Sequence, residues 1–386
     1  MSCRNIARIA VVLGSLPWMW PGSAVADPVE KVTPAPAAQG VQVEAAYFGD
    51  IVRNLDPGIV AADRKTVYQG LLDLGFTVHT GDAGWWRGGT FHVHAINTHG
   101  GQPSASHIGD VQFASNIEAA PHTLLYEAWY EQAFADGEVS LRAGLYDLNS
   151  EFYVSDYASL FLNSSFGVGG EISANVPASI FPRPGLGIRL RIQANQQVYI
   201  AAASCDGDPA TRKLSKAEGR MDIAEAGFRY AVDASRPGMF KVGVWQHTAL
   251  QPQPFGSRLF SRDYGSYAQL EQRLTNWEGG RFGAFLRYGI VPGDRNAVSS
   301  DLAAGLNLAG IMTGRPDDTL GLAMTRVDNL YAPGRRGFET TWELTYRLAV
   351  GKYLSLQPDY QWIHHPQGNP ANHDIRVLLG RLILEL

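Results

Sequence analysis

Polar and aromatic side chains alternate with apolar ones along two neighbouring stretches of the chain. Glu127, Trp129 and Glu131 take every second position of the first stretch, and Arg142 lies among apolar residues in the second. Such alternation places these side chains on one face of a β-strand. Carboxylates accept and guanidinium groups donate strong hydrogen bonds, and an aromatic ring offers an apolar surface. The face can therefore bind hydroxyl groups, or its charges can pair with one another across strands.

A turn signal, Asp136-Gly137, separates the two stretches and predicts a β-hairpin. With these residues at the turn centre, Glu131 lies across from Arg142 at the distance of a cross-strand pair. For any one charged residue of this face, we expect a cross-strand pair more often than contact with a solute. Glu131 and Arg142 are placed to do both.

The opposite face of the first stretch carries Leu124, Tyr126, Ala128 and Tyr130. Trp129 therefore points to the polar side, where so large a ring needs a partner. We expect Trp129 to contact either a solute or the long loop that follows the hairpin.

That loop, residues 148–184, has no strand pattern and is unusually long for an all-β chain. Loops of this kind are usually functional. Asn149, Glu151 and Asp156 are candidates to line a constriction, with local turn capping as the alternative. The candidate binding residues are completed by two arginines on one face of the next predicted strand, Arg189 and Arg191.

Strand-like segments separated by turn signals continue along the chain from residue 41. We count sixteen, which predicts an all-β fold. The predicted strands are 41–53, 66–79, 89–98, 122–134, 138–147, 185–194, 196–205, 221–232, 239–249, 264–274, 280–291, 298–309, 317–328, 336–350, 353–365 and 373–386.

The connections between these strands alternate in length. Those after even-numbered strands are mostly short, as at 351–352, whereas those after odd-numbered strands are mostly long, as at 99–121 and 206–220. Short turns on one rim and long loops on the other are typical of outer-membrane barrels. We predict a single closed, antiparallel transmembrane β-barrel over residues 41–386. We expect its longest loop, the third outer one, to fold into the lumen.

The strand faces favour a membrane barrel over a soluble sandwich. Segment 338–348 alternates apolar residues such as Leu344 with polar ones such as Glu343. Both architectures give this pattern. The number of such strands favours the barrel, as do aromatic residues at strand ends, such as Tyr346 and Trp362, where membrane interfaces place them. Closure also pairs every backbone group, which hydrocarbon requires.

The N-terminus predicts export. Residues 1–26 have a basic start, an apolar centre and Ala24-Val25-Ala26 as a cleavage site, the form of a secretory signal peptide. Residues 27–40, rich in Pro and Ala, are expected to form a flexible lead-in. The signal carries two arginines, so its removal makes a chain of formal net charge −5 more acidic. With no basic block, nucleic acid is not an expected partner.

Several short blocks point to a family. They are Leu125-Tyr-Glu-Ala-Trp-Tyr-Glu-Gln132, Asn149-Ser-Glu-Phe152, Ser155-Asp-Tyr157, Phe161-Leu-Asn-Ser-Ser-Phe-Gly167, Gly314-Arg-Pro-Asp317 and Leu356-Gln-Pro-Asp359. These blocks resemble the OprB-type carbohydrate-selective porins over almost the whole mature chain, and 149–167 is the most specific part. The resemblance implies a sixteen-stranded outer-membrane porin for sugars, without catalysis or cofactor. Barrels of the family usually end in an aromatic residue, whereas this chain ends in Leu386, a departure that bears on assembly.

We therefore expect passive, selective diffusion of small carbohydrates across the outer membrane of a Gram-negative bacterium. Expected partners are small carbohydrates, outer-membrane lipid, lipopolysaccharide and the barrel assembly machinery, and an oligomer is compatible with the sequence. A barrel that exports or anchors a polysaccharide is the binding alternative. An outer-membrane hydrolase is the enzyme alternative, although no catalytic motif accompanies it.

Histidines raise the question of a metal site. His92 and His94 share one face of a predicted strand, but no carboxylate or cysteine lies at a recognisable metal-binding spacing from them. We therefore expect no metal site, no cofactor and no catalytic residue.

Overall fold

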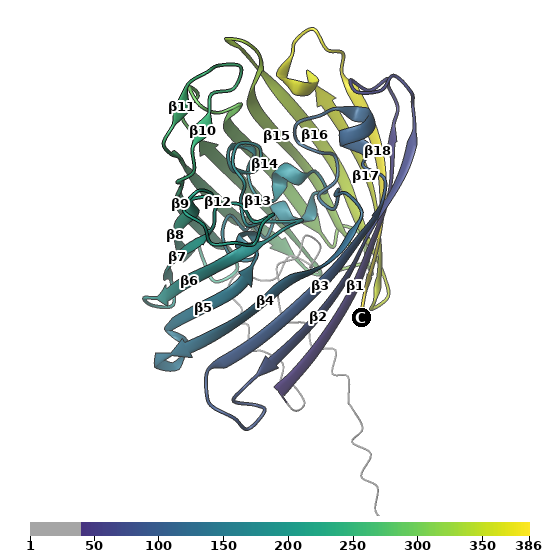
Figure 1. Ribbon diagram of the computed structural model, residues 1–386. Coiled ribbons are helices and arrows are strands. Elements are labelled where there is room, and N and C mark those ends of the chain that lie inside the picture. The colour runs from purple at the N-terminus through teal and green to yellow at the C-terminus, as the bar shows by residue number, and fades with distance from the viewer. Residues whose placement is uncertain (1–39) are drawn as a thin grey trace, which may run out of the picture.

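The computed structural model describes residues 40–386. The predicted signal peptide, residues 1–26, and residues 27–39 of the predicted lead-in lie outside the described residues. From β1 onward, sixteen strands form one closed barrel (Figure 1). The all-β fold class and the sixteen-stranded barrel predicted from the sequence are confirmed.

Neighbouring strands in the barrel are also neighbours along the chain, and β1 closes the barrel against β18. The barrel strands are β1 (Val41–Asn54), β2 (Thr66–His79), β3 (Gly89–Gly100), β4 (His122–Phe134), β5 (Val139–Tyr146), β6 (Gly185–Gln193), β7 (Val198–Asp206), β8 (Arg220–Ala231), β9 (Pro237–His247), β12 (Asp263–Trp277), β13 (Gly280–Ile290), β14 (Val298–Ala309), β15 (Thr319–Ala332), β16 (Arg335–Val350), β17 (Leu354–His364) and β18 (Ile375–Glu385). Two short strands, β10 (Gln251–Pro252) and β11 (Leu259–Phe260), pair separately between β9 and β12.

Each predicted segment corresponds to one barrel strand. The boundaries differ most at the end of β15, which was predicted to stop at residue 328 and continues to Ala332. The extension exists because β15 pairs with β16 as far as Ala332 opposite Arg335, which leaves a tight turn at Pro333 and Gly334. A proline and a glycine together favour such a turn.

Alternation along the strands separates an apolar outer face from a polar inner one. On β16, Trp342 and Leu344 are exposed on the outer face, and Leu344 is 48% exposed. Thr341 and Glu343, the intervening residues, are fully buried on the inner face. An outward apolar band with polar residues inside is the arrangement of a transmembrane barrel.

The seam between β1 and β18 is closed by a buried ion pair. Asp50 and Arg381 are opposite each other in the strand register, and Arg381 Nε lies 2.7 Å from Asp50 Oδ1. Ser115, from the connection after β3, donates a hydrogen bond of 2.6 Å to the same carboxylate. Separating a buried pair leaves an uncompensated charge, which is costly. The pair therefore favours this register of the first and last strands over a shifted one.

The two rims of the barrel carry connections of different length. Residues 135–138 join β4 to β5 and 278–279 join β12 to β13 on one rim, whereas loop 2 (101–121) and loop 3 (147–184) lie on the other. The turn at 333–334 is a short exception on the long-loop rim. Figure 1 shows the teal segment after β5 within the ring of strands.

Both long loops pack against the inner wall through apolar side chains. Phe161 and Phe166 of loop 3 meet Phe285 of β13, with ring centroids 5.8 Å and 6.0 Å away. Ile108 of loop 2 belongs to a buried cluster with Ile363 of β17. The sequence predicted an inward course for loop 3 alone, so the inward packing of loop 2 is an addition from the structure.

Helical structure in the described residues is confined to single turns. They are α1 (Gly170–Ser173) and the turns Ser104–Ile108, Ala135–Gly137, Leu148–Ser150, Ala158–Leu160, Ser164–Phe166 and Pro366–Gly368. Within residues 40–386, no helix is long and apolar enough to cross a membrane.

Candidate functional site

The hairpin of β4 and β5 pairs in the register that the sequence predicts. Glu131 is opposite Arg142, and Arg142 Nε donates a hydrogen bond of 2.8 Å to Glu131 Oε2. The turn has four residues, 135–138, rather than two, and Asp136 and Gly137 both have positive φ. Asp and Gly tolerate this conformation better than most residues. The turn is therefore longer than predicted but keeps the predicted register.

A bulge in β4 changes which side chains face inward. Leu125 and Glu127 pair with consecutive residues of β3, which leaves Tyr126 between them outside the register. Tyr126 is buried inside the barrel, and its hydroxyl donates a hydrogen bond of 2.5 Å to Asp147 of loop 3. The prediction that Tyr126 shares a face with Tyr130 is wrong, because the extra residue of a bulge interrupts the alternation.

Two arginines and two glutamates form an ion-pair cluster, which we call the Arg–Glu cluster. Arg189 of β6 contacts Glu151 of loop 3 through Nε at 2.5 Å and Nη2 at 2.6 Å, and lies 2.7 Å from Glu131. Arg142 lies 2.8 Å from Glu131 and 3.2 Å from Glu151. The structure thus brings together four of the predicted site residues. Because its charges balance, the cluster offers donors and acceptors to hydroxyl groups without favouring one sign of ion.

Glu151 ties loop 3 to the wall as a carboxylate. Burial raises the pKa of Glu151, but Arg142 and then Arg189 outweigh burial and lower that pKa to about 2. The Tyr146 hydroxyl donates a further hydrogen bond of 3.1 Å to it. Glu151 therefore stays ionised at neutral pH, and its contacts with both arginines persist there.

Trp129 is part of the wall rather than an open stacking surface. Its ring stacks on His92 of β3, with ring centroids 4.9 Å apart, and the Arg142 guanidinium carbon lies 3.8 Å from its ring centroid. Because β3 and β5 flank β4, these neighbours approach the ring from opposite sides. Trp129 also belongs to an apolar cluster that includes Leu148 of loop 3. Its cation–π contact orients Arg142.

Acidic side chains of the inner wall hold loop 3 by its backbone amides. The contacts run round the wall: Tyr153 N to Glu225 of β8 (3.1 Å), Tyr157 N to Glu271 of β12 (3.0 Å), Gly170 N to Asp301 of β14 (3.0 Å) and Asn163 N to Glu343 of β16 (3.0 Å). Hydrogen bonds from backbone N–H groups to carboxylates are among the stronger ones in proteins. We call these four acids the loop anchors.

Donor side chains of the wall hold the carbonyl groups of the same loop. They are Lys241 Nζ to Val154 O (2.6 Å), Arg287 Nη1 to Phe166 O (2.6 Å), Asn307 Nδ2 to Tyr157 O (2.8 Å) and Gln357 Nε2 to Leu160 O (2.7 Å). Loop 2 is held in the same way, because Glu339 of β16 accepts hydrogen bonds of 2.9 Å and 3.0 Å from Val111 N and Gln112 N. Much of the polar inner face therefore binds the chain's own backbone.

A cavity of 510 Å³ lies inside the barrel between loop 2, loop 3 and the wall. Glu127 and Asn149 line it, whereas the members of the Arg–Glu cluster do not. Its aromatic lining includes Phe113, Tyr126, Phe166 and Phe181, and its further polar lining includes Glu118 and Asp147. The volume and the mixed lining fall in the usual range for small-molecule sites.

Asp156 and Arg191 lie away from the Arg–Glu cluster contacts. The residues on either side of Asp156, Ser155 and Tyr157, both bind Glu271, so Asp156 lies along the β12 wall. The Arg191 guanidinium carbon lies 4.1 Å from the ring centroid of Tyr199. The structure therefore assigns the predicted site residues to several places rather than to one constriction.

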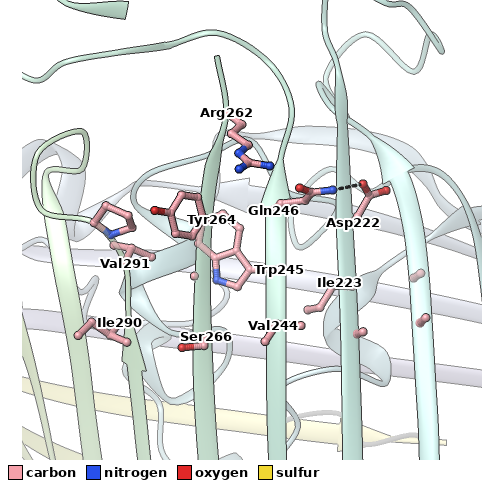
Figure 2. Close-up of a pocket in the computed structure, with 15 residues that line it drawn as sticks. Asp222, Ile223, Val244, Trp245, Gln246, Arg262, Tyr264, Ser266, Ile290 and Val291 are labelled. Carbon is pink, nitrogen blue, oxygen red and sulfur yellow. Dashed lines mark hydrogen bonds between the residues drawn. The ribbon is translucent and has the colours of Figure 1, made fainter. Parts of the chain in front are cut away.

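A larger hollow, of 870 Å³, lies elsewhere on the barrel wall. Figure 2 shows it over β7, β8, β9, β12 and β13, with Gln246 donating a hydrogen bond of 3.0 Å to Asp222. Its lining includes Val244 and Ile290, which are exposed on the outer face. None of its lining residues belongs to loop 2 or loop 3, so it is separate from the cavity between those loops.

Glycines on the inner face of β13 indicate in the sequence that a loop packs closely against this strand. A side chain at Gly283 of β13 would lie 2.1 Å from the ring of Tyr157, and one at Gly289 would lie 2.1 Å from the carboxyl group of Glu171. Both positions face the lumen and leave room for loop 3. Glycine inside a strand often marks such a close approach.

Comparison with known families decides the identity. A model of the carbohydrate-selective porins of the OprB family matches residues 63–382. The chain belongs to this family. Family and fold imply passive diffusion of carbohydrates across the outer membrane of Gram-negative bacteria. Comparison with curated protein sequences gives no significant match.

Solved structures share the barrel of this porin. The high-pH structure of Pseudomonas putida OprB matches with a TM-score of 0.81 at 18% sequence identity, covering 90% of this chain and 94% of that one. Its low-pH structure matches with a TM-score of 0.61 at 14% identity, covering 90% and 93%. A triple mutant of Rhodopseudomonas blastica porin matches with a TM-score of 0.52 at 11% identity, covering 90% and 100%. At these identities the likeness concerns the fold.

Proposed function

We propose that this porin passes small neutral sugars into the periplasm through two successive stations, first the cavity and then the Arg–Glu cluster. The cavity lies beside loops 2 and 3, which enter from the long-loop rim. Glu131 and Arg142 lie close to the short turn at 135–138, so the cluster is nearer the opposite rim. A solute entering between the loops reaches the cavity first.

The observation that carries this proposal is the mixed lining of the 510 Å³ cavity. A sugar has apolar ring faces and polar hydroxyl edges, so it needs both kinds of neighbour when it sheds water. The aromatic rings of Phe113 and Tyr126 supply the first, and the carboxylates of Glu127 and Asp147 supply acceptors. Placing a few polar groups in an apolar pocket is the general means of orienting a small ligand.

The Arg–Glu cluster provides a second set of hydrogen-bonding groups for the sugar, near the rim where the sugar leaves the channel. Arg142 and Arg189 donate and Glu131 and Glu151 accept, and the four charges cancel. A hydroxyl group can exchange with one of these bonds while the remaining ones hold the wall together. Because Trp129 is covered on both sides, its role is to position Arg142 rather than to stack on the sugar.

The docked loops favour small solutes over a polymer. Loop 3 is bonded to the wall from β8 to β16, and loop 2 is bonded to β16. Loops held in this way narrow the lumen, whereas export of a polysaccharide chain needs a wide passage. We therefore propose a passive channel with no catalytic step.

The remaining expectations concern export and surroundings. We propose that residues 1–26 direct export and are then removed, and that the barrel assembly machinery inserts the chain. Outward apolar side chains such as Leu344 and Trp362 support contact with outer-membrane lipid and lipopolysaccharide.

Single-channel recording in a planar bilayer tests the proposal. Small neutral sugars should reduce the current in a saturable way, because a bound sugar occupies the cavity. Glycerol at matched viscosity is the control for slower ion movement in an unselective pore. A current that falls only in proportion to viscosity, for every sugar, would contradict the proposal.

A further inference from the structure

Three potential metal ligands converge on the inner wall between β3 and β4. His92 and His94 are two residues apart on β3 and point to the same side of the sheet, and Glu127 is opposite His94 in the strand register. One donor atom from each lies within 4.8 Å of the others. The three residues are 3%, 6% and 2% exposed, respectively. The sequence spacing gave no carboxylate partner for the histidines, and the pairing of β4 supplies one.

Each of these ligands is oriented by a further contact. His94 Nε2 lies 2.5 Å from Asp73 of β2, while its Nδ1 lies 3.7 Å from Glu127 Oε2. His92 Nδ1 is hydrogen-bonded to the Thr77 hydroxyl at 2.8 Å. A hydrogen-bond acceptor on the second ring nitrogen, often a carboxylate, is the usual support of a metal-binding histidine, because it fixes the tautomer and the ring orientation. Asp73 supplies such a carboxylate to His94, and the Thr77 hydroxyl oxygen can accept from His92.

Glu127 is held in the same manner. Its Oε1 accepts a hydrogen bond of 2.9 Å from Asp147 N, which leaves Oε2 on the side of His94. The 3.7 Å between His94 Nδ1 and Glu127 Oε2 is close to the roughly 3.4 Å that separates two ligands bonded at about 2.1 Å to one tetrahedral ion. Small side-chain rotations therefore suffice to bring these donors onto a common ion.

We propose that His92, His94 and Glu127 bind one divalent transition-metal ion of the Zn²⁺, Cu²⁺ and Ni²⁺ class. Two imidazole nitrogens and one carboxylate oxygen form a donor set that such ions prefer over Ca²⁺ or Mg²⁺. His94 and Glu127 line the 510 Å³ cavity, so an ion reaches the site from the lumen. The neighbouring Asp73 contributes negative charge that favours a cation. Any proton on the ligating nitrogens passes to solvent on binding.

Binding measurements on the full mature chain test this site. The protein is purified in detergent without a polyhistidine tag, freed of metal with a chelator, and titrated with ZnCl₂ by calorimetry and with CuSO₄ by electron paramagnetic resonance. We expect one tight equivalent per chain, with nitrogen couplings from two imidazoles in the Cu²⁺ spectrum. His92→Gln and His94→Gln should each remove one nitrogen coupling and weaken binding at least tenfold.

Two further variants keep the test decisive. His364→Gln combined with His365→Gln removes a histidine pair on the outer rim, whose ring centroids are 3.7 Å apart, and should leave the tight equivalent unchanged. Glu127→Gln keeps an oxygen for Asp147 N, so it tests the carboxylate even if a histidine variant fails to fold, as judged by heat-modifiable gel mobility. It should weaken binding at least tenfold. Loss of binding in the rim variant, or unchanged binding in Glu127→Gln, overturns the proposal, as does the absence of a tight equivalent in the unmodified protein.

Discussion

Two regions of the inner wall carry buried charges and use them differently. In the Arg–Glu cluster, on β4 to β6, Arg142 and Arg189 pair with side chains of opposite charge. On β8 to β16, the loop anchors bind backbone amides of loop 3 instead. Both regions have the same alternating pattern in the sequence. The difference shows that an inward charge in a porin strand can bind either a charged side chain or the backbone of an inner loop.

The two regions also differ in what a solute can displace. A hydroxyl group can replace one contact of the Arg–Glu cluster, because each guanidinium group there has several donors. A loop anchor that loses its amide leaves a buried N–H group without a partner, which costs about 1–3 kcal/mol. The cluster is therefore suited to exchange, and the anchors are suited to fixing the diameter of the passage.

Deletion of residues 155–176, which form most of loop 3, should reveal most clearly how the roles of the Arg–Glu cluster and the loop anchors differ. The deletion keeps Glu151, and with it the Arg–Glu cluster, and it keeps Tyr153, whose amide binds Glu225. It removes the loop partners of the other three anchor acids and exposes them to the lumen. We expect a severalfold higher conductance, loss of sugar block and a shift toward cation selectivity. Single-channel recording with a salt gradient measures all three.

A shortened connection after β7, residues 210–216, is the matched control. This segment lies on the same rim, and it carries no loop anchor, so conductance and sugar block should stay unchanged. Equal conductance of the loop 3 deletion and the unmodified channel would show that loop 3 does not limit the passage.

Glu343→Ala should weaken one anchor while leaving the loop in the chain. The carboxylate accepts hydrogen bonds from Leu162 N at 2.5 Å and Asn163 N at 3.0 Å. Their loss should destabilise docking of this segment by about 1–3 kcal/mol. Faster hydrogen exchange at Leu162 and Asn163 and more frequent current fluctuations are the expected readouts.

Glu343→Gln is the control for this anchor, because its amide oxygen still accepts one of the two bonds. Its exchange rates should fall between those of the unmodified protein and Glu343→Ala. If all three proteins exchanged these amides at the same rate, the contacts would not stabilise the docked loop.

How much of this could be predicted from the sequence differs between the two regions. The Glu131–Arg142 pair follows from strand alternation and from the turn at Asp136-Gly137, which are local signals. The loop anchors do not follow, because nothing local distinguishes a Glu343 that binds a loop from a Glu131 that binds a strand. Their partners lie far away in the sequence.

The bulge and the glycines show the same limit. Strand periodicity cannot predict where a β-bulge inserts an extra residue. The sequence therefore did not predict that Tyr126 points inward, or that its ring lines the cavity. Gly283 and Gly289 could have indicated an inner loop, since large side chains are absent where the wall should be full. Which loop side chains fill that space is a matter of three-dimensional packing.

Rising pH should loosen the docking of α1. Burial, and then the nearby carboxyl group of Asp301, raise the pKa of Glu171 above its usual range. The docked loop therefore favours protonated Glu171, while an undocked loop loses that proton at ordinary carboxyl pKa values. Docking should weaken as pH rises from about 5, until the docked group also ionises. Current fluctuations recorded from about pH 5 to about pH 8 measure this, and Glu171→Gln should reduce their dependence on pH.

Arg142→Ala should have the smallest effect and is the sharpest test of the Arg–Glu cluster. The change removes one donor from the passage, but Arg189 still pairs with both Glu131 and Glu151. If Arg142 contacts sugar, the affinity measured from current block should fall by about 0.5–1.5 kcal/mol, the net value of one hydrogen bond. If Arg142 only pairs across strands, thermal stability should fall by about 0.2–1 kcal/mol while sugar affinity stays unchanged.

Arg191→Ala is the control for this variant. Like Arg142, Arg191 faces inward over an aromatic ring, that of Tyr199. Unlike Arg142, it has no direct ion pair with the cluster glutamates among the described contacts. A fall in sugar affinity in Arg142→Ala that Arg191→Ala does not share would place the donor on the sugar's route, whereas equal losses in both would point to a general change of charge in the lumen.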